Sequence, residues 1–126
     1  MPTAILTYMP GNKRGARKLA RSIPNLAAAH VNIEGAPRHE GGVTAAEMIV
    51  RLQKGSKRDI NAPDINVHIR AHNFPARVKD GQQRTERLHD AFREHLDNNE
   101  HKQASLSVEL ELADLGYKAS YPGERP

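Results

Sequence analysis

Pro2 is the residue whose chemistry would be most unusual in this chain, provided that its nitrogen is free. Removal of Met1, which a small second residue favours, would convert that nitrogen from an amide into a secondary amine. A free α-amino group titrates near pH ~8 in reference peptides, and burial or a cationic neighbour lowers its pKa toward neutrality, where a general base works best. The alternative interpretation is a simple bend before the apolar run 3–8. The residue type alone leaves both interpretations open.

An excess of basic side chains is the second feature that could carry a function. The chain has 19 Lys and Arg but only 15 Asp and Glu, which gives a formal net charge of +4. They gather at two places in the sequence, first at Lys13, Arg14, Arg17, Lys18 and Arg21, then at Lys54, Lys57 and Arg58. Such clusters suit an anionic partner. Because no aromatic residue is interleaved with them, we do not expect nucleic acid as a partner, and we interpret them as a solvated helix face and a charged turn.

Composition excludes several kinds of site. The chain has no cysteine, so disulfides and thiolate metal sites are excluded. His68 and His72 lie four residues apart in a predicted strand, about 13 Å at the usual strand rise, which is too far for one metal ion. No segment approaches the ~20 apolar residues of a membrane span, and the N-terminus lacks the pattern of a secretion signal. We therefore expect a cytoplasmic protein without membrane contact.

Strands and helices that would position Pro2 can be predicted from the periodicity of apolar residues. Alternation predicts strands at 3–8, 65–72 and 105–112, and a strand is expected within 43–52, where a helix is the alternative. Helical spacing predicts two helices. The first covers 13–31 and carries Pro24, where we expect a kink or a break. The second follows an Asp80 N-cap, with Gln83 at capping-box spacing, and ends near Asn98.

The order of these elements is strand-helix-strand, repeated once, in a single domain of 126 residues. We divide the chain into a first unit at 1–62, a second unit at 63–115 and an irregular tail at 116–126. Two such units predict an α+β fold in which a four-stranded sheet carries both helices on one face. The open face would carry charges of both signs that can pair across strands, namely His68, Arg70, Glu109 and Glu111.

Four local features of the chain resemble the tautomerase superfamily, and within it 5-carboxymethyl-2-hydroxymuconate isomerase. Met1-Pro2 leads directly into the first strand, and 19–29 (LARSIPNLAAA) matches the first helix of that family with its interior proline. Val67-His68-Ile69 matches a strand core, and the following Ala76-Arg77 falls where the family has a Gly-Arg. The segment 104–111 (ASLSVELE) is similar to the family's last strand.

The resemblance implies a homotrimer whose sheets surround a central channel, with the active site at the proline. There an unprotonated Pro2 would move a proton between positions of a small unsaturated keto acid, as in aromatic catabolism, without a metal or organic cofactor. Cationic side chains would hold the substrate carboxylates and lower the pKa of the amine. Pro2 and Arg77 fall on matching positions. An arginine that the family has at the start of its second strand is missing, because this chain reads Thr44 there, and the nearest arginine is Arg38.

Two functions from different classes follow. The first is a tautomerase or isomerase in which Pro2 is the catalytic base, Arg77 binds a substrate carboxylate and Arg38 would substitute for the missing cation from a shifted loop. The second is a non-catalytic trimeric binding protein of the same fold, which binds an anionic partner through its basic helix. The absence of an arginine at position 44 and the excess of basic residues motivate the second, and we favour the first.

Overall fold

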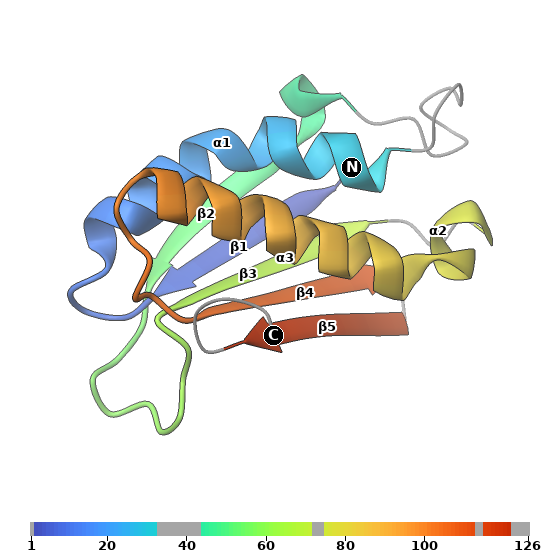
Figure 1. The fold of residues 1–126 in the computed structure, drawn as a ribbon. Helices are drawn as coiled ribbons and strands as arrows, with labels where there is room; N and C mark the ends of the chain where they lie inside the picture. The colour runs from blue at the N-terminus through green and yellow to red at the C-terminus, as the bar shows by residue number, and fades with distance from the viewer. Residues whose placement is uncertain (1, 33–43, 72–74, 113–114, 122–126) are drawn as a thin grey trace.

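The structure, a computed structural model, describes residues 2–32, 44–71, 75–112 and 115–121. Helices α1 (Lys13–Val31) and α3 (Gly81–Asn98) lie across one face of a mixed sheet, as Figure 1 shows. The described part also contains a short helix α2 (Pro75–Lys79) and a 3-10 helix (Ala45–Glu47). The strands follow the order β2-β1-β3-β4-β5, with β1 (Thr3–Tyr8), β2 (Ile49–Lys54), β3 (Ile65–Ala71), β4 (Leu106–Leu112) and β5 (Leu115–Tyr121).

Two strand-helix-strand units build the sheet. β1 pairs in parallel with β2 across α1, and β3 pairs in parallel with β4 across α3. The units meet where β1 and β3 pair antiparallel, with Ile5 opposite His68. The predicted α+β architecture of two such units with both helices on one face is confirmed. None of the described helices is long and apolar enough to cross a membrane.

The end of the chain departs from the prediction. Residues 116–126 were expected to be irregular, yet β5 pairs antiparallel with β4, with Leu112 opposite Leu115. The sheet therefore has five strands among the described residues, not four. Without β5, the outer edge of β4 would leave its backbone N–H and C=O groups unpaired beside a buried row of leucines, and the added strand satisfies them.

The first helix and the second strand also differ from their predictions. α1 is one helix across Pro24, because a single missing backbone donor is outweighed by packing of the buried Ile23 and Ala27 on either side. β2 starts only at Ile49, after the 3-10 turn, so neither a strand nor a helix over the whole of 43–52 describes that region. Asp80 is the N-cap residue of α3 as predicted, but its side chain makes no capping hydrogen bond.

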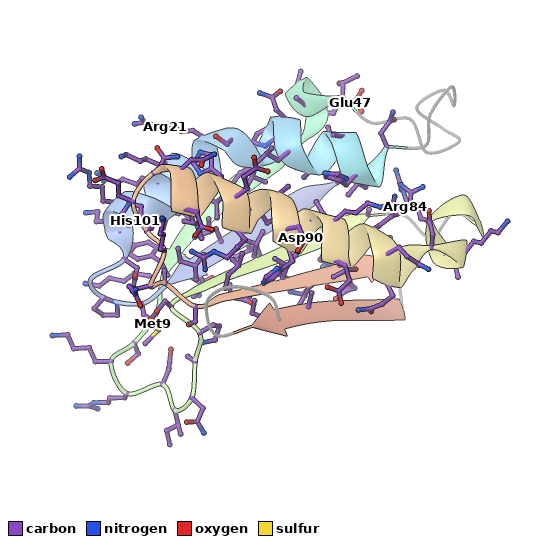
Figure 2. The ribbon with its side chains drawn as sticks, viewed as in Figure 1. Met9, Arg21, Glu47, Arg84, Asp90 and His101 are labelled. Atoms are coloured by element: carbon purple, nitrogen blue, oxygen red, sulfur yellow. The ribbon has the colours of Figure 1, made fainter. Side chains whose placement is uncertain are left out.

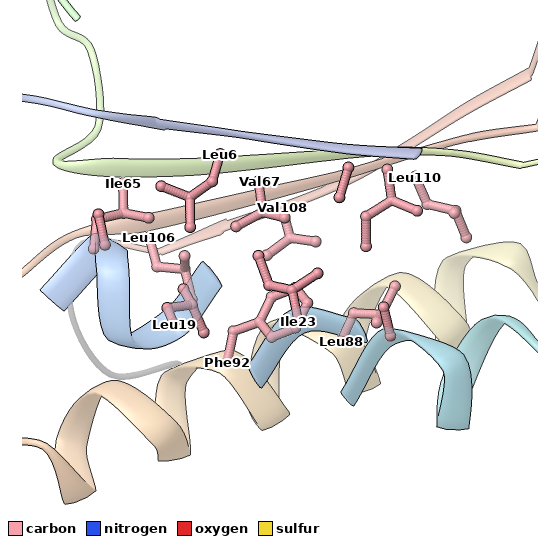
Figure 3. Close-up of a cluster of buried hydrophobic side chains, with 14 of the residues drawn as sticks. Leu6, Leu19, Ile23, Ile65, Val67, Leu88, Phe92, Leu106, Val108 and Leu110 are labelled. Carbon is pink, nitrogen blue, oxygen red and sulfur yellow. The ribbon is translucent and has the colours of Figure 1, made fainter. Parts of the chain in front are cut away.

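The core lies between the sheet and the two long helices. Every second residue of β1, β3 and β4 faces the helices, and Figure 3 shows Leu6, Val67 and Val108 of the strands packed toward Ile23 of α1 and Phe92 of α3. These five side chains are fully buried. Burial of this face fixes the register of the strands, since a shift by one residue would turn each apolar side chain outward.

Candidate active site

Pro2 is buried where β1 begins. Its carbonyl oxygen accepts a hydrogen bond of 3.4 Å from the backbone N–H of Ile49, so Pro2 is held between the starts of two parallel strands. Ala4, two residues further on, is fully buried in the same cluster as Val31 at the end of α1. Pro2 therefore occupies the edge of the sheet at which β1 and β2 begin and α1 ends. We call this edge the proline end.

Two arginines of the second unit reach the proline end and bind the last carbonyl groups of α1. Arg77 of α2 is 2% exposed, and its Nε donates a hydrogen bond of 2.8 Å to the carbonyl of Val31. Arg84 of α3 donates from Nη1 to the carbonyls of His30 and Asn32, at 2.7 and 3.1 Å, and from Nε to Asp80 Oδ1 at 2.6 Å. Figure 2 shows Arg84 beside α2 at this end. The carbonyls that end a helix carry partial negative charge, and the cations satisfy them.

Burial gives Arg77 unusual electrostatics. Desolvation first, and the positive charge of Arg84 second, lower the pKa of Arg77 to about 10. The side chain is still charged at neutral pH. The pKa of His30 is also lowered, by burial and then by Arg87 and Arg84. The smaller, coulombic cause of both shifts is the positive charge of neighbouring arginines, and that charge would attract an anion to the proline end.

The predicted site residues are only partly brought together. Pro2 and Arg77 lie at the same end of the sheet, while Arg38 lies outside the described residues. Thr44, which stands where the resembled family has an arginine, is exposed, and its Oγ1 donates a hydrogen bond of 3.2 Å to Glu47 Oε1. Arg84 was not predicted as a site residue. Its spacing of four residues from Asp80 indicates only an ion pair on a helix surface.

The open face of the sheet carries a charged cluster, as the sequence predicted. Arg70 Nε donates a hydrogen bond of 2.7 Å to Glu111 Oε2, and His68 Nε2 lies 3.2 Å from Glu111 Oε1. Glu109 Oε2 lies 4.0 Å from His68 Nδ1. His72 is outside the described residues. Among the residues that are described, no group of three or more His, Asp or Glu could hold a metal ion.

Comparison with known proteins adds information on the fold alone. No family model matches the sequence, and no curated protein matches it significantly. Among the solved structures that match, one described as the crystal structure of native Ps01740 has a TM-score of 0.50 and 15% sequence identity. The match covers 90% of this chain and 93% of that chain. At this identity the likeness supports the architecture and says nothing of the reaction.

Proposed function

We propose that this protein, once Met1 has been removed, is a tautomerase or isomerase that uses Pro2 as a general base on a small unsaturated keto acid. The observation that carries the proposal is the placement of Pro2. It is buried at the start of a central strand, at the end of the sheet where the guanidinium groups of Arg77 and Arg84 also lie. The resemblance to 5-carboxymethyl-2-hydroxymuconate isomerase supplies the substrate class, and with it a place in cytoplasmic catabolism of aromatic compounds.

The reaction needs only a proton carrier and a cation. The lone pair of the free Pro2 nitrogen accepts a proton from one position of the substrate, the double bonds shift, and the resulting ammonium returns the proton to another carbon. The substrate is isomerised without loss of atoms or electrons. Arg77 pairs with a substrate carboxylate and stabilises the negative charge of the intermediate. Burial would disfavour the ammonium form of Pro2 and keep its nitrogen available as a base.

We also propose that the protein forms a homotrimer. Two apolar side chains on the open face of the sheet support it, since Ile5 is 36% exposed and Ile49 is 44% exposed. They stand on the same face as the cluster of His68, Arg70 and Glu111, because Thr3 is opposite both Ile49 and Arg70 and Ile5 is opposite His68. Association through this face would bury both isoleucines. Native mass spectrometry measures the number of chains.

Ketonisation of a phenylenolpyruvate-type enol tests the catalytic role of Pro2. The chain that begins at Pro2, as verified by intact mass, should accelerate ketonisation, and Pro2→Ala should lose most of that acceleration. A matched control inserts one alanine between Met1 and Pro2, which leaves the proline side chain in the sequence but converts its nitrogen into an amide. If this insertion variant folds and is as active as the original chain, Pro2 is not the base.

The alternative function, a non-catalytic protein that binds an anionic partner, is favoured by one observation, the cationic surface of α1. That surface lies at the other end of the molecule and does not depend on Pro2. An inactive chain with a verified free Pro2 would favour this alternative.

A further inference from the structure

A cationic surface covers the first half of α1. Five side chains line one surface depression of about 370 Å³, namely Lys13, Arg14, Arg17, Lys18 and Arg21. Four of them are exposed and Lys18 is half-buried. We call these five residues the α1 basic patch. With a rise of 1.5 Å per residue, the patch extends about 12 Å along the helix axis.

The positive charges of the patch destabilise the helix that carries them. The first turn of α1 has no acidic residue, so Lys13 and Arg14 stand at the positive end of the helix dipole without compensation. Like charges recur at a spacing of four residues, which places Lys13 beside Arg17 and Arg17 beside Arg21. Within the described part of the chain, no carboxylate oxygen lies within 4.0 Å of the charged nitrogens of the patch. Such a local conflict is typical of a functional surface.

Neighbouring elements extend the positive charge. Lys54, at the end of β2, pairs with Tyr8 just before α1 begins, and the exposed Lys57 and Arg58 follow it. The ring of His101, from the connection between α3 and β4, lies against Gly15 of α1, 3.0 Å from the position that a Cβ would take. Figure 2 shows Arg21, His101 and Met9 at this end and Arg84 at the opposite one. The patch is therefore remote from the proline end.

The basic patch adjoins a histidine of α3. The pKa of His95 on α3 is lowered, first by burial and then by Lys18 and His101. His95 Nε2 lies 2.9 Å from Ser22 Oγ of α1. Both residues line a second depression, which also borders Arg21 of the basic patch. Ser22 and His95 thus connect α1 and α3 beside the patch.

From this arrangement we infer that the α1 basic patch binds the phosphate backbone of duplex nucleic acid without reading its sequence. Three of the five cations are arginines, whose planar guanidinium groups suit phosphate oxygens. The chain has no Phe, Tyr or Trp between positions 9 and 64, so neither α1 nor the turn after β2 contributes an aromatic side chain on which unpaired bases could stack. The lack of interleaved aromatic residues, on which the sequence-based expectation of no nucleic-acid partner rests, excludes base stacking but not phosphate contacts. The inference is independent of the catalytic role of Pro2.

Salt dependence of binding to a labelled duplex of 20 base pairs tests the inference. Three to five phosphate contacts predict a slope of about −3 to −4.5 for the logarithm of the binding constant against that of the salt concentration. The variant Arg17→Gln/Arg21→Gln should reduce the magnitude of this slope by about 2 and weaken binding to duplexes of unrelated sequence equally. The matched control Lys79→Gln/Arg87→Gln removes the same charge from exposed positions of α2 and α3, and should retain the original slope.

Three results would overturn the inference. One is equal weakening by both double variants, which would make net charge the only cause. Another is the absence of duplex binding at 25 mM salt by the intact, folded protein. A third is tighter binding to a single strand, to poly-glutamate or to vesicles with anionic headgroups than to the duplex. Thermal unfolding of both variants checks that each is folded, and the patch variant should melt no lower than the original protein.

Discussion

Arg77 and Arg84 lie at the same end of α1, yet their replacement should affect different properties. We predict that Arg77→Met removes activity, whereas Arg84→Met lowers stability more and leaves activity largely intact at temperatures where the variant is folded. The structural basis is the balance between hydrogen bonds lost and unfavourable charge removed. That balance differs between the two side chains.

For Arg77, the hydrogen bond to Val31 and the desolvation of the charge act in opposite directions. Loss of the charged hydrogen bond to the carbonyl of Val31 costs about 1.5–3 kcal/mol. The fall in the pKa of Arg77 to about 10 corresponds to roughly 3 kcal/mol that disfavours the charged form, and methionine removes that penalty. Because these two contributions are opposed, Arg77→Met should be less destabilising than Arg84→Met. Loss of the cation from the site should lower kcat/KM by about 100-fold, the usual order for one donor to a developing anion.

For Arg84, the hydrogen bonds dominate. Its guanidinium holds Asp80 and the carbonyls of His30 and Asn32, and its side chain is only 12% exposed. Removal of a nearly buried guanidinium that has these partners should lower the free energy of unfolding by about 3–5 kcal/mol. Urea denaturation measures this quantity, and ketonisation at 10 °C measures activity. If Arg77→Met is as destabilising as Arg84→Met, or keeps full kcat/KM, then Arg77 holds α1 in place and does not bind substrate.

Three further predictions concern stability. Burial lowers the pKa of three histidines, so the unfolded chain binds more protons below pH ~6.5 and the melting temperature should fall from pH 7 to pH 5. The three histidines with lowered pKa are His30, His89 and His95. His95→Gln should flatten this fall, and an unchanged profile would exclude His95 as a contributor. Arg17→Gln/Arg21→Gln should raise the free energy of unfolding by about 0.4–1 kcal/mol in thermal melts, because it removes two repulsive pairs, and a loss would contradict the repulsion. Phe92→Ala should lower it by about 3–5 kcal/mol in urea, and a loss below 1 kcal/mol would contradict tight packing of this fully buried ring.

Periodicity predicted most of the fold because burial on one face dictates it. The alternation at 105–112 and the apolar stripe of 13–31 gave β4 and α1, each with its buried face. β5 was not predicted, because its sequence LGYKASY lacks a clean alternation and contains Gly116. The pairing of β5 is dictated by the open edge of β4, which is a tertiary cause that local sequence does not carry.

The candidate site was only partly predictable. Pro2 stands out through its position in the chain, and Arg77 through the resemblance. That Arg77 and Arg84 both bind the end of α1 depends on how the second unit packs on the first, because Val31 and Arg77 are 46 residues apart. The burial of Arg77, which lowers its pKa, likewise follows from packing. Such long-range contacts cannot be derived from spacing within either segment.

The nitrogen of Pro2 is the centre of this account, and its titration tests the account most directly. The protein labelled with ¹⁵N-proline, followed by NMR from pH 5 to pH 10, should contain one proline nitrogen that titrates, with a pKa below the ~8 of a free α-amino group. That resonance should be absent from the variant with alanine inserted before Pro2. If no proline nitrogen of the original protein titrates, Pro2 is an amide in the folded chain and the proposed base does not exist.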